Sequence, residues 1–133
     1  MNNKIPVIIL GYMFAAMNSA FAGTAVISPD KGKMIFSERC TSCHTVNKQL
    51  VGPALAKVDE KHTIDWIVNF VHSPKALIQK NDKQAVALFI EFNQVVMPDH
   101  KDLTTDDIRS IVAYIKAEAK TVSASTPDRK RTR

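Results

Sequence analysis

The most informative segment of the sequence is short and reads Cys40-Thr41-Ser42-Cys43-His44. On one turn of helix, positions i, i+3 and i+4 share a face, so the two thiols and the imidazole point the same way. Two such thiols can add to the two vinyl groups of a haem, and the adjacent histidine then faces the iron. This C-x-x-C-H pattern is typical of c-type haem attachment. We therefore predict one haem c, bound covalently through Cys40 and Cys43, with His44 as an iron ligand.

Two other interpretations of the cysteine pair are weaker. A thioredoxin-like redox pair is expected within a βαβ pattern, and the sequence shows no alternating strand pattern. A zinc site needs a second Cys/His pair at suitable spacing, which is also missing. The chain has no further cysteines. A disulfide between these two would close so small a loop that it would add little stability.

The haem iron also needs a second protein ligand or an open position. The candidates are Met34, His62, His72, Met97 and His100. We favour Met97, because Pro98 restrains the residue before it to extended conformations and methionine is a common cytochrome ligand. Met34 is expected to pack in the core, and the histidines are expected to be solvated or to cap helices. Among the histidines, His100 is the leading alternative ligand because it is close to Met97 in sequence.

The first 22 residues have the layout of a secretory signal peptide. Lys4 gives a positive start, an apolar run extends from Ile5 to about Met17, and an Ala-x-Ala pattern ends at Ala22. We predict cleavage after Ala22 and export to the periplasm, which fits covalent haem attachment outside the cytoplasm. An uncleaved membrane anchor is the alternative, although the run is shorter than the roughly 20 apolar residues that span a bilayer.

Helical periodicity dominates the rest of the sequence. Helices are expected over residues 28–40, 63–73 and 74–78, from Asp82 to about 92, and from Thr104 or Thr105 onward, with loops over 47–57 and 93–102. Ser28, Thr63 and Asp82 are suitable N-caps, and Thr104 with Asp107 resembles a capping box. The fold class is therefore all-α: one small domain over residues 23–120, with about four to five helices packed around one haem.

Charge is concentrated at the C-terminus. The chain has 18 basic and 13 acidic residues, for a formal net charge of +5. The cluster consists of Arg129, Lys130, Arg131 and Arg133. The globular part is close to neutral, so nucleic-acid binding is not predicted. We expect residues 121–133 to form a basic, disordered tail that is a solvated end of the chain. The alternative is that this tail contacts an acidic partner or an anionic membrane surface electrostatically.

Several segments, in this order and at this rough spacing, resemble the single-haem class I c-type cytochromes. They are residues 32–36 (Gly-Lys-Met-Ile-Phe), 40–44, 51–55 (Val-Gly-Pro-Ala-Leu), 96–98 (Val-Met-Pro) and 103–115. The resemblance extends from Pro29 to about Ala119, and the combination of C-x-x-C-H with a downstream Gly-Pro and a late Met-Pro is specific. It implies the cytochrome c fold.

The resemblance also implies a role for each residue of the site. Cys40 and Cys43 would form the thioethers, His44 would be the proximal ligand and Met97 the distal ligand. The carbonyl of Pro53 would accept a hydrogen bond from the other ring nitrogen of His44, which fixes the orientation of the ring.

The resemblance further implies that the first and last helices cross. Gly32 would lie at the closest approach, with Phe36 and Tyr114 nearby. In some relatives a ring donor near the haem edge reaches a propionate. Trp66 lies in a helical apolar stripe, so we expect it to pack in the core instead.

The predicted function is that of a one-electron carrier of a respiratory chain, not an enzyme. With histidine and methionine on the iron there is no vacant position for a substrate, and we expect a monomer that exchanges electrons with a donor and an acceptor protein. One alternative is an electron-entry subunit of a larger respiratory or dehydrogenase complex. Another is a haem-based protein that binds or senses a gas, with Met97 absent from the iron.

Overall fold

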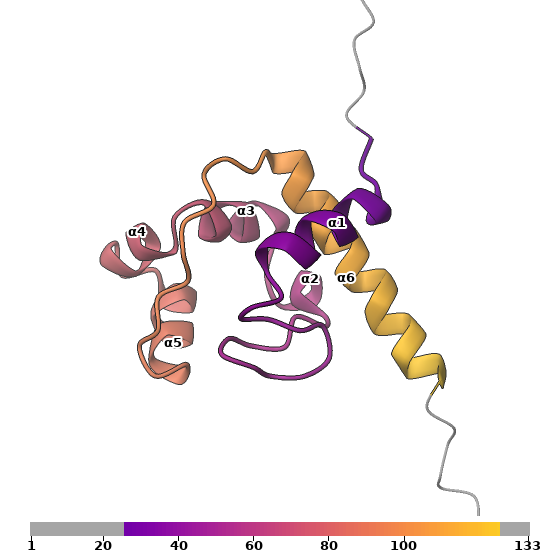
Figure 1. The fold of residues 1–133 in the computed structure, drawn as a ribbon. Helices are drawn as coiled ribbons and strands as arrows, with labels where there is room; N and C mark the ends of the chain where they lie inside the picture. The colour runs from indigo at the N-terminus through magenta and orange to yellow at the C-terminus, as the bar shows by residue number, and fades with distance from the viewer. Residues whose placement is uncertain (1–25, 126–133) are drawn as a thin grey trace, which may run out of the picture.

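The computed structural model describes residues 26–125 and contains helices and loops, with no strand in that range (Figure 1). The helices are α1 (Pro29–Arg39), α2 (Val58–Lys61), α3 (Ile64–His72), α4 (Pro74–Gln79), α5 (Lys83–Glu91) and α6 (Thr105–Ser125). The predicted signal peptide and residues 126–133 lie outside the described residues. No helix within residues 26–125 has the length and apolar character needed to cross a bilayer.

The all-α prediction is confirmed, but the described residues form six helices and not four or five. The additional helix is α2, a single turn that follows Lys57, whose φ of 63° is left-handed. A helix of four residues is too short to show helical periodicity, so its presence cannot be predicted from the pattern of apolar residues.

The predicted helix starts are confirmed by their side-chain caps. Ser28, Thr63 and Asp82 accept hydrogen bonds from backbone N–H groups at 3.4, 3.3 and 2.9 Å. At the start of α6, the Thr104 hydroxyl accepts from the Asp107 N–H at 3.1 Å, and an Asp107 carboxylate oxygen accepts from the Thr104 N–H at 2.9 Å. This reciprocal pair is the capping box that the sequence predicts.

The last helix is longer than predicted. It continues to Ser125, so residues 121–125 are helical. The prediction of a disordered tail that starts at Thr121 is therefore wrong for these five residues. The reason is that a helix already formed adds residues at little cost until a breaker is reached, and the next proline is Pro127. The Thr121 hydroxyl donates to the Glu118 carbonyl at 2.8 Å, which satisfies a polar group within the helix.

Helices α1 and α6 cross at close range (Figure 1). A Cβ atom on Gly32 would lie 1.9 Å from the carbonyl oxygen of Ser110, so only glycine fits there. The backbone N–H of Ser28 donates to the Ser110 hydroxyl at 3.2 Å, and the rings of Phe36 and Tyr114 lie 5.4 Å apart. The predicted helix crossing and the role of Gly32 in it are therefore confirmed.

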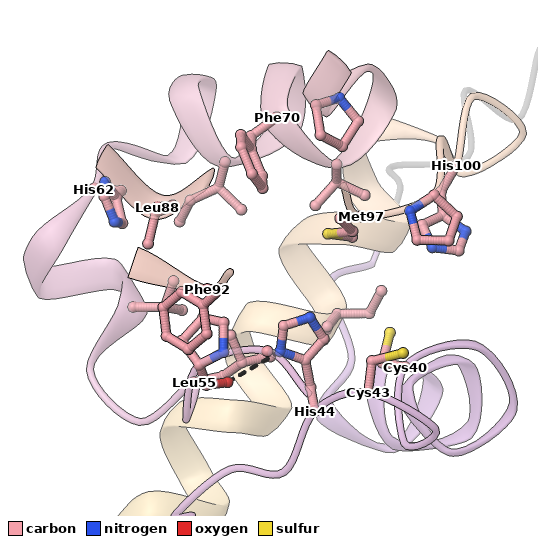
Figure 2. Close-up of a pocket in the computed structure, with 18 of the residues that line it drawn as sticks. Cys40, Cys43, His44, Leu55, His62, Phe70, Leu88, Phe92, Met97 and His100 are labelled. Carbon is pink, nitrogen blue, oxygen red and sulfur yellow. Dashed lines mark hydrogen bonds between the residues drawn. The ribbon is translucent and has the colours of Figure 1, made fainter. Parts of the chain in front are cut away.

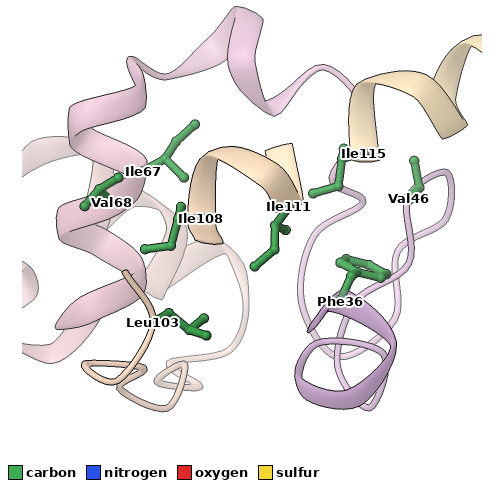
Figure 3. Close-up of a cluster of buried hydrophobic side chains, with 8 residues drawn as sticks. All are labelled: Phe36, Val46, Ile67, Val68, Leu103, Ile108, Ile111 and Ile115. Carbon is green, nitrogen blue, oxygen red and sulfur yellow. The ribbon is translucent and has the colours of Figure 1, made fainter. Parts of the chain in front are cut away.

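The hydrophobic core lies where α1, α3 and α6 meet (Figure 3). Its buried members are Phe36, Val46, Ile67, Val68, Leu103, Ile108, Ile111 and Ile115. Met34 was expected in this core, and that expectation is wrong because its side chain is 60% exposed. Two residues along a helix correspond to about 200° of rotation, so the face that carries Gly32 towards α6 turns Met34 towards solvent.

Candidate functional site

A cavity of about 400 Å³ separates α5 and its neighbouring loops from the helices of the core. It contains every residue that the sequence assigned to the site, namely Cys40, Cys43, His44, Pro53 and Met97. Most of the other lining side chains are apolar and come from the 51–58 segment, α3, α5 and α6. Figure 2 shows the sulfur atoms of the two cysteines on the same side of this cavity.

The two cysteines sit on a turn that continues directly from α1. Cys40 caps the helix by donating its N–H to the Phe36 carbonyl at 2.9 Å. The N–H groups of Cys43 and His44 both donate to the Cys40 carbonyl, at 3.1 and 2.9 Å. This turn places both thiols and the imidazole along one cavity wall, as the spacing predicts.

Burial raises the pKa of the Cys40 thiol to about 11, and the nearby Arg39 offsets only part of this effect. Reactive redox cysteines have the opposite property, because the thiolate is their working form and their pKa is lowered. The environment of Cys40 therefore disfavours the thioredoxin-like interpretation.

The ring of His44 is held from behind by the Pro53 carbonyl. The distance from His44 Nδ1 to that oxygen is 3.0 Å, as predicted (Figure 2). A carbonyl can only accept, so Nδ1 is the donor in this contact. The contact therefore leaves Nε2 as the ring nitrogen that would bind a metal ion, and it fixes the ring plane.

Gly52 supports the same ring, and sequence reasoning missed this role. A Cβ atom on Gly52 would lie 2.4 Å from His44 Cε1, so the ring packs directly on the glycine backbone. The Gly52 N–H also donates to the Cys43 carbonyl at 2.9 Å, which ties the loop to the cysteine turn. The available signal was the Gly-Pro pair within the loop predicted over residues 47–57, because a glycine lets another group approach its backbone closely.

The structure divides the candidate second ligands into two groups. Met97, His62 and His100 line the cavity, whereas Met34 and His72 do not. Figure 2 shows the His44 ring and the Met97 thioether on facing sides of the cavity. Burial lowers the pKa of His100 and thus favours its neutral form.

Trp66 belongs to a stack of three rings beside the cavity. Its indole lies 4.2 Å from the ring of His62 and 4.8 Å from that of Phe70, measured between ring centroids. Its Nε1–H donates to a carboxylate oxygen of Asp82 at 3.1 Å, and it packs against the core. The predicted packing role is confirmed, and the indole N–H is used to bind the cap of α5.

Comparison with known proteins places this architecture in a family. The family model described as Cytochrome c matches residues 29–118, which is most of the chain. The chain belongs to the cytochrome c family. This agrees with the resemblance seen in the sequence and with the helical fold.

Solved cytochromes c have the same fold. Cytochrome c from Rhodothermus marinus is 27% identical, with a TM-score of 0.62, over 70% of this chain and 78% of that one. The cytochrome c domain of the pp3183 protein from Pseudomonas putida is 26% identical, with a TM-score of 0.58, over 71% and 92% of the two chains. A search of curated proteins gives no match.

Cytochromes c carry a covalently bound haem c, and the residues of this cavity fit that group. Both thiols line one wall within a single turn, and the surrounding surface is apolar enough to cover a porphyrin. The glycine at position 52 leaves room for a histidine ring whose Nδ1 is already occupied. Haem c is therefore the cofactor of this protein, with Cys40 and Cys43 as its C-x-x-C-H attachment pair.

Proposed function

We propose that this cytochrome c is an exported single-haem electron carrier in which His44 and Met97 are the axial ligands of the iron. The observation that carries the proposal is that these two residues line one apolar cavity whose wall also bears the attachment cysteines. Their side chains face one another there, as Figure 2 illustrates.

The residues around the site suit electron transfer. The bound haem supplies the one-electron chemistry, and the protein supplies orientation and electrostatics. The Pro53 carbonyl and Gly52 hold the His44 ring in a single orientation. The apolar lining excludes water, so few dipoles must reorganise when the charge changes, and a methionine ligand raises the reduction potential.

The proposed ligand set leaves no site for catalysis at the iron. With His44 and Met97 both bound, no coordination position would remain for a substrate. His62 and His100, which also line the cavity, could act as acid or base only if the Met97 position were open. We therefore propose a carrier without enzymatic activity.

The proposed setting is the periplasm, where the protein would act as a monomer between a donor and an acceptor protein of a respiratory chain. We infer removal of residues 1–22 from the leader pattern. The mass of the protein isolated from the periplasm should correspond to a chain that begins at Gly23. A mass that retains residues 1–22 would support the membrane-anchored form instead.

The basic cluster at the C-terminus is proposed to guide docking to an acidic partner or an anionic membrane surface. Deleting residues 127–133 should slow electron exchange with an acidic redox partner at low salt and reduce its salt dependence. Rates and salt dependence that stay at the wild-type values would exclude this role.

The ligand proposal is tested by absorption spectra of protein made with a haem-attachment system. The wild type should show the weak far-red ferric band of iron–thioether coordination, and the reduced form should not bind carbon monoxide. Met97→Ala should lose the band and bind the gas, whereas His100→Ala should keep the wild-type behaviour.

Two results would redirect the proposal. Loss of the wild-type spectrum in His100→Ala, with Met97→Ala unaffected, would transfer the ligand role to His100. A wild-type protein that lacks the band and binds carbon monoxide would favour the gas-binding alternative.

A further inference from the structure

The segment that carries Met97 has little hydrogen bonding of its own. Before it, the Val95 N–H donates to the Phe92 carbonyl at 3.1 Å, and after it the His100 N–H donates to the Val71 carbonyl at 3.0 Å. Between these two bonds, the N–H groups of Val96 and Met97 donate to no other group of residues 26–125. The position of the Met97 thioether therefore depends on how firmly the two ends of the segment are held.

The end after Met97 is a turn that binds to the C-terminus of α3. The turn covers residues 100–103 and is closed by the Leu103 N–H, which donates to the His100 carbonyl at 3.2 Å. Its first residue, His100, donates to the carbonyl of Val71, one of the carbonyls that a helix end leaves unpaired. Its last residue, Leu103, accepts a hydrogen bond from the ring of His72 at 2.7 Å.

This second bond identifies the donor atom of the His72 ring. The acceptor is a carbonyl oxygen, so Nε2 must carry a proton. His72 is half-buried and does not line the cavity, and the side chain of Leu103 belongs to the core. The bond thus joins the α3 end to the point where the loop enters the core.

A third contact reaches the same turn from outside. Arg39 and Asp102 form an ion pair at 2.9 Å, which links the turn to the end of α1 beside Cys40. Their side chains are 39% and 59% exposed, and exposed ion pairs contribute little. The half-buried His72 bond is therefore the stronger anchor.

We propose that His72 is a positioning residue for the iron site. Its Nε2–H bond to the Leu103 carbonyl holds the turn that follows Met97, and this keeps the Met97 thioether in place against competing iron ligands. The proposal rests on Met97 being the distal ligand. This role cannot be predicted from the sequence, because His72 and Leu103 are 31 positions apart.

The test measures how well imidazole displaces Met97 in the ferric holoprotein. His72→Phe keeps a flat ring but removes the donor, and His72→Gln retains a donor at a similar reach. Lys116→Met serves as the control, because it removes an ion pair of 2.8 Å with Asp59 that joins α6 to α2, and it leaves the Met97 loop untouched. The readouts are the far-red ferric band and the dissociation constant of imidazole.

The loss of one hydrogen bond to a partly buried group should increase imidazole affinity about tenfold in His72→Phe, with a weaker far-red band. His72→Gln should recover most of the wild-type affinity, and Lys116→Met should bind imidazole as the wild type does. Wild-type affinity in His72→Phe, or an equal change in Lys116→Met, would overturn the positioning role while leaving Met97 as the ligand. A wild type without the far-red band would overturn the ligand proposal and this one with it.

A measurement on the wild type alone guards against a variant that fails to fold. Nitrogen NMR of the reduced holoprotein should show His72 as the Nε2–H tautomer, with a ring proton that exchanges much more slowly than that of free imidazole. A His72 ring in the other tautomer, or one with freely exchanging protons, would overturn the proposal without any substitution.

Discussion

The α1–α6 crossing and the wall formed by α4 and α5 are stabilised in different ways. At the crossing, two backbones touch directly at Gly32 and Ser110, and the surrounding side chains are buried against one another. The apolar side chains of that half of the molecule are buried by other side chains of the protein.

The apolar side chains of the opposite wall face the cavity instead. Helix α5 packs mainly on α4, and its apolar side chains, with those of the loop that follows, line the cavity. These residues are Ala85, Leu88, Phe89, Phe92 and Val95. The α1–α6 crossing is therefore stabilised by direct helix packing, whereas the wall that contains α5 needs the haem to bury its apolar face.

The largest effect should come from removing the haem. Replacing both Cys40 and Cys43 by alanine prevents covalent attachment and leaves the cavity-facing side chains of α5 without a surface to pack on. The apoprotein should lose cooperative thermal unfolding and the near-ultraviolet circular dichroism of Trp66, the only tryptophan. A cooperative, native-like thermal unfolding transition of the haem-free protein would show that neither region needs the haem in order to fold.

The next effect should come from the crossing itself. Gly32→Ala places a methyl group against the Ser110 carbonyl, and the overpacking should cost at least about 2 kcal/mol of unfolding free energy, more than the roughly 1 kcal/mol gained in helix propensity. Denaturant unfolding of the holoprotein measures this cost. Lys33→Ala, at an exposed neighbouring position, is the control and should be close to neutral. A stabilised Gly32→Ala protein would mean that the helices can separate freely.

The matching substitution in the haem half is Gly52→Ala. The new methyl group would displace the His44 ring and lengthen its bond to the Pro53 carbonyl, at a cost of about 1–2 kcal/mol. Unlike Gly32→Ala, this change should also shift the reduction potential, because the ligand basicity depends on that bond. Potentiometric titration is the measurement, with the exposed Gln49→Ala as the control. An unchanged potential would show that the ring tolerates movement.

The smallest effect concerns acid stability at the crossing. The Lys31 ammonium and the capping hydroxyl of Thr104 lower the pKa of Asp107 from 3.8 to about 2. Because the folded-state pKa is depressed, the contribution is complete above about pH 4 and is lost as the pH falls towards 2. Lys31 is half exposed, so we expect about 1 kcal/mol.

Asp107→Asn tests this contribution. The difference in unfolding free energy between wild type and variant should shrink between pH 4 and pH 2. If this difference does not change between pH 4 and pH 2, the negative charge of Asp107 does not contribute to the stability of the folded protein.

Local chemistry made much of this protein predictable. The C-x-x-C-H turn, the caps at Ser28, Thr63 and Asp82, and the Thr104–Asp107 pair all lie within five residues of sequence, so short-range geometry is enough to recognise them. Pro53 and Gly32 needed the family resemblance as well, because their partners are distant in sequence. The structure confirms both contacts.

The predictions that differ from the structure have separate physical causes. Met34 is apolar and lies in a helix beside Ile35 and Phe36, which predicts a core position, but the side of α1 that is buried is set by α6. The end of α6 was misplaced because polar composition says little about a helix that is already propagating. The support of His44 by Gly52 depends on how a loop folds back onto the cysteine turn.

The sequence by itself determined the chemistry: two thiols and an imidazole on one turn, a late methionine before a proline, and helices whose ends are marked by their caps. The tertiary structure decided which side chains surround the cavity and what holds them there. Bonds such as that from His72 to the Leu103 carbonyl join elements far apart in the chain. Residue type and spacing specify short-range contacts, but long-range contacts exist only once the helices have packed.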